Sequence, residues 1–343
     1  MSKIVAALLA LGIGASQAMA AEPLTVVSFG GTNRDAQDSA FYKPFTEKTG
    51  IPVLAADYNG EMAKIKVMAD TGNTTWDVVE VESPELLRGC SEGLFEQLNW
   101  PAIGRREAFL PEAVSPCGVG IFIWSTVLTY NSSKLASAPR SWADFWDTKR
   151  FPGKRGLRRG AKFTLEFALL ADGVKKEDLY KVLATREGVD RAFRKLDQIK
   201  PDIQWWESGA QPLQWLAAGD VVMTSAYNGR VNGAQQEGQP FAIQWNGSLY
   251  DLDHWAIVKG SKHKAAAEQF IAFASQAQQQ KGFVQRIPYG PSNIATLDLL
   301  DRTTANNLPT ARQNLANARA TDTEFWLDNG EELEERFNAW ASK

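Results

Sequence analysis

Short apolar runs alternate with amphipathic segments along the first third of the chain. Runs at 24–29, 51–54 and 77–81 have the length and the β-branched content of buried strands. Between them, segments 40–48 and 61–69 place apolar side chains three and four positions apart, which is typical of helices with one buried face. Strands and helices that alternate in this way predict an α/β fold with a parallel sheet.

The rest of the chain continues this alternation around one unusually long strand pattern. The strand-like run at 118–130 is longer than a usual strand, and we expect it to cross from one domain into another. Because the chain has 343 residues, two domains of ordinary size are expected. Further strands are predicted at 220–226 and 253–258, and further helices at 165–170, 176–183, 189–199 and 264–274.

Residues 1–20 have the pattern of a secretory signal peptide. Lys3 precedes an apolar run at 4–13, and Ala18 and Ala20 supply the small residues of a cleavage site after Ala20. The apolar run is shorter than the roughly 20 residues that a membrane-spanning helix needs. We therefore expect an exported, soluble protein.

Composition narrows the possible functions. A net charge of −3 argues against binding of nucleic acid, which usually requires a strongly basic surface. Two His and two Cys leave little material for a structural zinc site, which needs about four such ligands, and we expect neither a metal nor a cofactor. In an oxidising compartment Cys90 and Cys117 can pair, so we expect a disulfide, with two separately buried thiols as the alternative.

Catalytic signatures are missing from the sequence. It contains no Gly-x-Ser-x-Gly elbow, His-Glu-x-x-His motif, phosphate-binding loop or dinucleotide fingerprint. The pairs Glu80/Glu82 and Asp251/Asp253 occupy alternating strand positions and could form the carboxylate dyad of an exported hydrolase. Acids at a solvated strand edge or end are the commoner explanation. We expect a protein that is not an enzyme, and the hydrolase is the alternative.

Several segments resemble one known family over nearly the whole mature chain. These segments, in order, are 45–53, 130–131, 141–145, 213–223 and 253–259, the last followed by the helix at 265–273. Their order and spacing resemble the periplasmic solute-binding proteins of bacterial ABC importers, in the branch that captures polyamines such as spermidine and putrescine. The resemblance implies a periplasmic protein that binds a small-molecule ligand, works with an ABC permease in the inner membrane and is a monomer.

The resemblance also implies a particular architecture. It is the two-lobed α/β fold of the type II periplasmic binding proteins, in which each lobe is a mixed, mostly parallel sheet flanked by helices. The expected first lobe comprises 21–128 and 257–343, and the expected second lobe comprises 129–256. One solute would lie in the cleft between them.

The residues expected to hold the ligand depart from the polyamine pattern. In the family, cleft carboxylates hold the ammonium groups of the polyamine. Here Arg230 stands where the family has an aspartate, whereas Asp253 keeps the next carboxylate. The turn at Phe29, Gly30 and Gly31 also lacks the family's Trp, Ser and Asp. One ammonium acceptor is therefore retained, and two others are missing.

Charge then predicts the class of ligand. An ammonium about 4 Å from a guanidinium is repelled by about 4 kcal/mol at an effective dielectric near 20, which is roughly three decades in affinity. A carboxylate gains a bidentate partner instead. With Arg230 at one end and Asp253 at the other, an ω-amino acid such as 4-aminobutyrate or 5-aminovalerate fits. A polyamine, with Arg230 on an exposed loop, is the alternative.

Aromatic residues complete the expected cleft. We expect Phe29 and Tyr289 to act from the first lobe, Tyr227 and one of Trp205 and Trp206 from the second, and Trp255 beside Asp253. Lobe core is the alternative for the Trp205–Trp206 pair. The amides of 207–209 could also receive the carboxylate. The remaining tryptophans considered are expected in packing or surface positions, and they are Trp124, Trp142, Trp146, Trp215 and Trp340.

Overall fold

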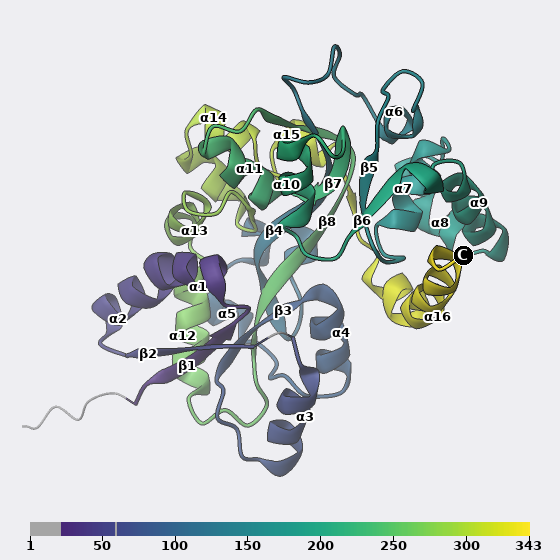
Figure 1. The fold of residues 1–343 in the computed structure, drawn as a ribbon. Coiled ribbons are helices and arrows are strands. Elements are labelled where there is room, and N and C mark those ends of the chain that lie inside the picture. The colour runs from purple at the N-terminus through teal and green to yellow at the C-terminus, as the bar shows by residue number, and fades with distance from the viewer. Residues whose placement is uncertain (1–21, 59) are drawn as a thin grey trace, which may run out of the picture.

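A computed structural model describes residues 22–58 and 60–343 (Figure 1). The predicted signal peptide and its cleavage site after Ala20 lie outside the described residues. Among the residues described, no helix is long and apolar enough to cross a membrane.

One continuous sheet runs through the molecule, in the strand order β2-β1-β3-β8-β4-β7-β5-β6. Pairing is parallel at its two ends, between β1 and both β2 and β3 and between β5 and both β6 and β7. In the centre, β8 is antiparallel to β3 and β4, and β4 is antiparallel to β7. The strands are β1 (Leu24–Ser28), β2 (Val53–Asp57), β3 (Val78–Glu82), β4 (Gly118–Asn131), β5 (Arg155–Arg158), β6 (Ile203–Trp206), β7 (Met223–Tyr227), β8 (Phe241–Ile257), β9 (Gly290–Pro291) and β10 (Arg319–Ala320).

Two long strands join the ends of the sheet. β4 has 14 residues and β8 has 17, and they pair from Gly118↔Ala256 to Asn131↔Phe241. The predicted crossing strand at 118–130 is therefore confirmed. Only the end of β8 was expected, because its earlier part mixes polar residues such as Gln244, Asn246 and Ser248 with apolar ones.

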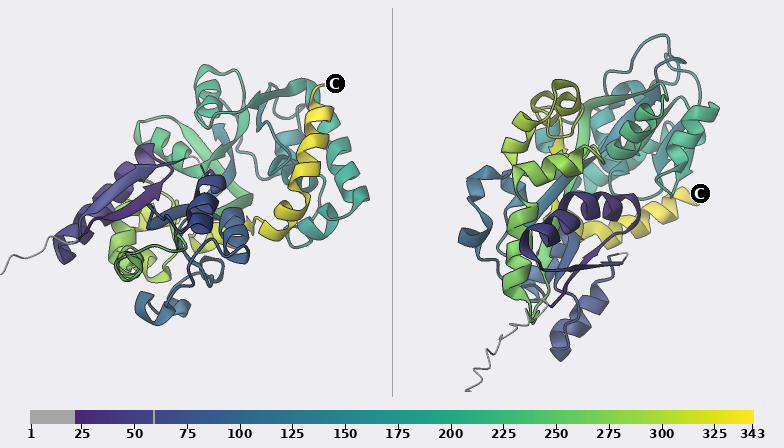
Figure 2. Two further views of the ribbon diagram at one scale, coloured as in Figure 1. Left: turned by 90° about the horizontal axis from the view of Figure 1, so that it is seen from below. Right: turned by 90° about the vertical axis from the view of Figure 1, so that its left-hand side faces the viewer.

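Helices cover both faces of the sheet (Figures 1 and 2). The expected helices at 61–69, 165–170, 176–183, 189–199 and 264–274 correspond to α3, α7, α8, α9 and α12. A π-helical turn at Asp38–Tyr42 and α2 together occupy the segment 40–48. The α-helices are α1 (Gly31–Gln37), α2 (Lys43–Thr49), α3 (Met62–Thr71), α4 (Ser83–Ser91), α5 (Trp100–Ile103), α6 (Trp142–Trp146), α7 (Thr164–Ala171), α8 (Leu179–Leu183), α9 (Arg186–Asp197), α10 (Gln211–Ala218), α11 (Asn228–Gln236), α12 (Lys264–Ala274), α13 (Ala277–Val284), α14 (Arg302–Asn306), α15 (Arg312–Leu315) and α16 (Thr323–Ala341).

Separate hydrophobic cores lie at the two ends of the sheet. We call the part built on β1, β2 and β3 the first lobe and the part built on β5, β6 and β7 the second lobe. The first is packed around Phe41 and Phe270, and the second around Phe145 and Phe167. Phe337 of α16 belongs to the second core, and Figure 1 shows this helix in yellow beside α8 and α9. The first lobe was expected to include the whole of 257–343, whereas α16 packs in the core of the second lobe.

The two cysteines form a disulfide, as predicted. Cys90 in α4 is bonded to Cys117, which immediately precedes β4, with 5.8 Å between the Cα atoms. Both side chains pack in a smaller apolar cluster of the first lobe. The bond therefore links a surface helix to the start of a crossing strand within one lobe.

Candidate ligand-binding site

Glu80 is a fully buried carboxylate on β3, the third strand of the first lobe. Its side-chain oxygens accept hydrogen bonds from Asn33 Nδ2 at 2.9 Å, from Gln37 Nε2 at 3.1 Å and from the Phe29 amide at 3.3 Å. Tyr42 donates to Gln37 Oε1 at 2.6 Å, which leaves the Gln37 amide nitrogen to face Glu80. The loop after β1 and the helix α1 thus supply donors to one acidic side chain.

Asp253 on β8 lies beside Glu80. In the antiparallel register Glu82 is opposite Asp253 and Glu80 is opposite Trp255, so Glu80 and Asp253 occupy one face of the sheet. The two carboxyl groups are hydrogen-bonded to each other, and Trp124 Nε1 donates to Asp253 Oδ1 at 2.9 Å. They form a carboxyl pair at the point where the crossing strands leave the first lobe.

The pair lacks the solvent that normally keeps two carboxylates ionised. Burial, together with the negative charge of Glu80, raises the pKa of Asp253 well above its usual value. Burial also raises the pKa of Glu80, but its hydrogen bonds from Asp253, Asn33 and Gln37 oppose this increase. We therefore assign the proton to Asp253 and the negative charge to Glu80.

Aromatic rings surround the carboxyl pair. The ring of Tyr227 stands edge-on to Trp124 and to Trp206, with 5.6 Å between centroids in each case. From the first lobe, Phe29 stacks on Tyr58 at 5.2 Å. The rings therefore come from both lobes and from a crossing strand.

Tyr289 connects the two lobes. It stacks on Phe122 at 5.0 Å, and its ring lies so close to Gly229 that a Cβ atom at that position would collide with it. The preceding residue, Pro288, accepts a hydrogen bond from Asn228 Nδ2 at 2.9 Å. This segment of the first lobe thus rests on the first turn of α11 in the second lobe.

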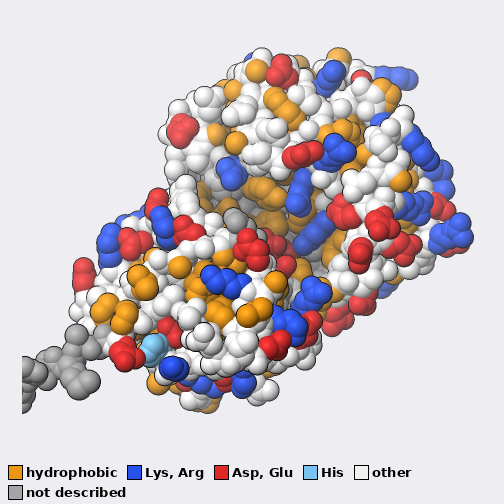
Figure 3. All heavy atoms as spheres, turned by 60° about the horizontal axis from the view of Figure 1, so that its bottom comes forward, with side chains coloured by type: hydrophobic (Ala, Val, Ile, Leu, Met, Phe, Trp, Pro, Cys, Tyr) orange, Lys and Arg blue, Asp and Glu red, His pale blue; other side chains and the backbone are white. Residues whose placement is uncertain are grey.

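Arg230 follows directly on that turn. Its side chain is exposed, and no carboxylate within residues 22–58 and 60–343 forms an ion pair with it. Burial and the charge of Asp253 raise the pKa of Tyr289, whereas the charge of Arg230 opposes the increase. The Tyr289 hydroxyl therefore lies within electrostatic reach of both the carboxyl pair and the guanidinium. A space-filling view shows the molecule hollowed between its two parts, with hydrophobic, Lys and Arg side chains in the hollow (Figure 3).

Most of the predicted cleft residues surround this region, but Trp255 lies in the first core and the half-buried Trp205 packs against the second. Trp205 packs edge-on against Phe337 and Trp340 of the C-terminal helix. Trp255 is 1% exposed and lies edge-on to Phe270 in the first core. The expectation that these two rings line the cleft is therefore corrected, because each is already covered by aromatic side chains.

The amides after β6 are also engaged. The backbone N–H groups of Glu207 and Ser208 both donate to Gln211 Oε1 at 2.8 Å. They do not face the space between the lobes as free donors, in contrast to the expectation for 207–209. Of the groups predicted to receive the carboxylate of the ligand, Arg230 is the one that stays a candidate.

Sequence reasoning missed part of the cluster. Trp124 was expected in packing, yet it contacts Asp253 directly. Glu80 was considered only as an acid of a hydrolase. One signal could have identified it: a single acidic residue interrupts an otherwise apolar buried run, between Val79 and Val81.

A metal does not account for the acids. In the chain as described, no group of three or more His, Cys, Asp or Glu side chains is placed to hold a metal ion. The acids at the lobe junction instead have neutral donors or a lysine as partners. Lys162 Nζ lies 3.2 Å from Asp251 Oδ2, next to Glu82, whose pKa burial raises to about 7.

Comparison with known proteins gives a consistent result. The sequence profile of the bacterial extracellular solute-binding proteins matches residues 40–309. The chain is 62% identical to a gamma-aminobutyric acid-binding protein of Pseudomonas aeruginosa, over 98% of this chain and 96% of that protein. It is 24% identical to a spermidine/putrescine-binding periplasmic protein of Salmonella typhimurium, over 87% and 86%.

Solved structures show the same architecture. The structure of the Atu4243 GABA receptor superposes with a TM-score of 0.84 at 37% identity, covering 94% of this chain and 98% of that one. A substrate-binding protein of an ABC transporter from Bradyrhizobium japonicum also superposes with a TM-score of 0.84, at 35% identity, over 93% and 99%. The fold is the two-lobed α/β fold of the type II periplasmic binding proteins, as expected.

Proposed function

Because the chain belongs to the bacterial extracellular solute-binding proteins, we propose that it captures an ω-amino acid, with 4-aminobutyrate as the first candidate. The single observation that supports this choice is the charge arrangement of the site. A buried carboxyl pair and an exposed guanidinium, which has no ion-pair partner within residues 22–58 and 60–343, both act electrostatically on the Tyr289 hydroxyl. A short chain with an ammonium and a carboxylate at opposite ends complements both.

The ammonium end would occupy the carboxyl pair. Glu80 and Asp253 both present oxygens there, and Trp124 and Tyr227 supply aromatic surfaces nearby. An ammonium group has three donors and no acceptor, so acceptor oxygens and ring faces suit it. The hydrogen bonds from Asn33 and Gln37 fix the Glu80 oxygens in place before the ligand arrives.

The carboxylate end would meet Arg230. The planar guanidinium forms paired hydrogen bonds with a carboxylate, and Arg230 has no competing acid in the part of the chain that is described. Because Arg230 lies on the second lobe and Glu80 on the first, such a ligand contacts both lobes. Differential contact of this kind is what favours the closed form over the open one.

A polyamine is the alternative ligand. The relatives that bind spermidine and putrescine share only 24% identity or less with this chain. A second ammonium placed about 4 Å from Arg230 would be repelled by about 4 kcal/mol at an effective dielectric near 20. We therefore propose a preference for ω-amino acids over diamines of the same length.

The cellular role follows from the family. Relatives of the chain are periplasmic binding proteins, and we propose delivery of the ligand to an ABC permease of the inner membrane by a monomeric protein. Cleavage of the signal peptide after Ala20 belongs to the same proposal. The relatives identified are binding proteins rather than hydrolases, and recovery of unchanged ligand after prolonged incubation would test this role.

A matched ligand panel tests the proposal. Titration calorimetry of the mature chain with 4-aminobutyrate, n-butylamine and putrescine varies only one end of a four-carbon chain. We expect 4-aminobutyrate to bind most tightly and putrescine about a thousandfold more weakly. The Arg230→Gln variant should lose most of this preference, whereas Arg302→Gln, an exposed residue of α14, should keep it. Putrescine binding as tight as that of 4-aminobutyrate would refute the proposal.

A further inference from the structure

Within residues 22–58 and 60–343, no cationic side chain is hydrogen-bonded to or ion-paired with the carboxyl pair. The groups that contact Glu80 and Asp253 through hydrogen bonds are neutral, namely the side chains of Asn33, Gln37 and Trp124 and the amide of Phe29. Neutral donors can stabilise one negative charge. They cannot hold two touching carboxylates ionised in a buried site.

Charged groups farther away do not change this balance. Those near the pair or its neighbours are Glu82 on β3, Asp251 on β8, Arg230 on α11, and the phenols of Tyr42, Tyr58, Tyr227 and Tyr289. Lys162 is paired with Asp251 and acts on Glu82. The charge of Arg230 acts on Tyr289. The carboxyl pair therefore shares one proton while the site is empty.

We propose that the ammonium group of the ligand replaces the proton shared by Glu80 and Asp253, so that each binding event releases a proton. This inference rests on the proposed function, because it requires a ligand with an ammonium group. In the empty site, Asp253 donates its O–H to the Glu80 carboxylate. On binding, that O–H bond breaks, the proton passes to the solvent, and both carboxylates accept N–H bonds from the ammonium.

The exchange leaves the charge of the buried site unchanged. The empty pair carries one negative charge, shared by two carboxyl groups. The occupied pair carries two negative charges and one ammonium, which again sum to one negative charge. A buried site in which charge is costly can therefore accept an ammonium without acquiring a net charge that it did not have before.

Proton exchange also narrows the ligand class. The replaced proton sits between two oxygens in hydrogen-bond contact, so the incoming group needs at least two N–H donors. Primary ammonium groups meet this requirement, whereas a quaternary ammonium has none. We therefore expect 4-aminobutyrate to bind and its trimethylated analogue to bind at least about a hundredfold more weakly, since two buried acceptors would be left unpaired.

Calorimetry in several buffers measures the proton directly. The mature chain is titrated with 4-aminobutyrate at one pH near 6.5, in buffers with different enthalpies of ionisation. The slope of the observed heat against the buffer enthalpy gives the number of protons released. We expect more than about half a proton per ligand, and affinity that rises with pH by up to about tenfold per unit. Binding with a slope of zero would overturn the inference and leave the proposed function intact, whereas no binding at all would overturn both.

Two variants assign the proton to its source. Asp253→Asn leaves an amide beside an ionised Glu80, so whatever binding persists should release no proton. Glu82 is a half-buried acid beside the pair, and burial raises its pKa to about 7. Glu82→Gln is therefore the matched control, and it should still release a proton on binding, as the parent chain does. Release that disappears in Glu82→Gln and persists in Asp253→Asn would overturn the assignment.

Discussion

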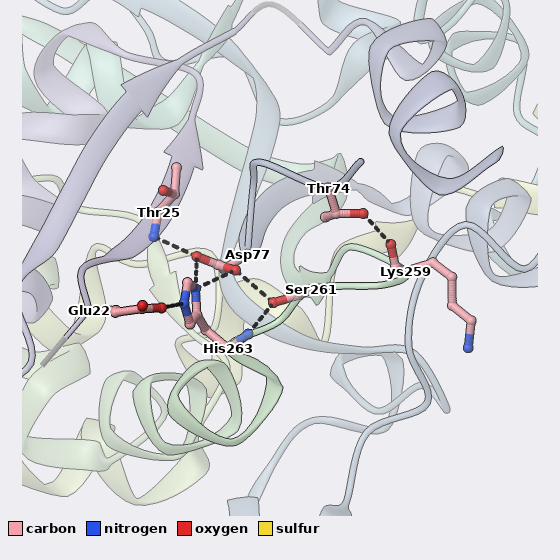
Figure 4. A network of polar contacts seen from close by, with 7 residues as sticks. All are labelled: Glu22, Thr25, Thr74, Asp77, Lys259, Ser261 and His263. Carbon is pink, nitrogen blue, oxygen red and sulfur yellow. Dashed lines mark hydrogen bonds and ion pairs between the residues drawn. The ribbon is translucent and has the colours of Figure 1, made fainter. Parts of the chain in front are cut away.

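Two groups of acids on and beside β3 differ in the partners that the protein gives them. At the start of the strand, Asp77 accepts hydrogen bonds from the Thr25 amide at 2.8 Å and from Ser261 Oγ at 2.6 Å, and it pairs with His263 (Figure 4). Glu22 pairs with the other ring nitrogen of His263 at 2.7 Å. Farther along the same strand, Glu80 faces Asp253, and among the residues that the structure describes no cation pairs with it.

The presence or absence of a partner within the chain distinguishes acids that stabilise the fold from acids that are candidates for ligand binding. At Asp77 the protein supplies the partner itself, a histidine whose pKa is raised by Glu22 and Asp77, and the network joins β1, β3 and the start of α12. At Glu80 we propose that the ammonium group of the ligand takes the corresponding position. Buried acids that are fully partnered within the chain stabilise a fold, whereas buried acids that lack a counter-charge mark a place where one is expected to bind.

The largest expected effect is a loss of binding in Glu80→Gln. Removing the partner of a buried charge typically costs about 2–5 kcal/mol of affinity, and we expect the dissociation constant for 4-aminobutyrate to rise at least about a hundredfold. Stability should change little, because the amide can still accept from Asn33 and donate to Asp253. A variant that binds normally would show that the pair is structural, like the Asp77 network.

At Asp77, at the start of β3, a substitution is expected to lower stability and to leave ligand binding unchanged. Asp77→Asn removes the charge that three donors share, and the free energy of unfolding should fall by about 2 kcal/mol. Denaturant unfolding measures this loss, with Asp70→Asn as the control, since Asp70 is exposed and pairs only with Lys66. Affinity for 4-aminobutyrate should be unchanged, and a large loss of affinity would remove the distinction between the two regions.

A smaller effect on binding is expected at the contact between the lobes. In Gly229→Ala the new methyl group would collide with the Tyr289 ring and displace it, and affinity should fall by about tenfold, or about 1.4 kcal/mol. Gly233→Ala lies one turn later on the same helix, with open space around the added atom, and should bind normally. Equal affinities in the two variants would exclude Tyr289 from the site.

The smallest expected effect is a pH dependence of stability from His263. Its pairing with Glu22 and Asp77 raises the pKa of His263 above the usual value. The ion pairs of His263 therefore stabilise the fold fully at pH values below its pKa in the unfolded chain, which is about 6.5. This stabilisation disappears as the pH rises through the higher pKa of His263 in the folded protein. The difference in unfolding free energy between the parent chain and His263→Gln should shrink by about 0.5–1 kcal/mol between pH 6 and 9. A difference that stays constant with pH would contradict this assignment.

Local pattern predicted the elements better than it predicted their partners. The apolar runs located β1, β3 and the long crossing strand β4, and the two cysteines are bonded as expected. The neighbour of Glu80 depends on the register between β3 and β8, which lie far apart in the sequence, and no local pattern specifies that register.

The wrong prediction for Trp205 also arose because packing between distant parts of the chain is not encoded in the local pattern. Trp205 was expected in the cleft because of its place next to Trp206 in the sequence. Successive side chains of a strand point to opposite faces, and α16, more than a hundred residues later, covers the face that carries Trp205. Only Trp206 remains near Tyr227. Long-range packing, which the sequence pattern does not contain, decided between the two rings.

Inverting the charge at position 230 tests the central claim most directly. We propose that the carboxyl pair at one end of the binding site and Arg230 at the other determine which ligand is bound. Dissociation constants for 4-aminobutyrate and putrescine should therefore be measured by calorimetry on the parent chain and on Arg230→Asp. We predict that the parent prefers 4-aminobutyrate and that the variant prefers putrescine. A variant that still prefers 4-aminobutyrate would contradict the account.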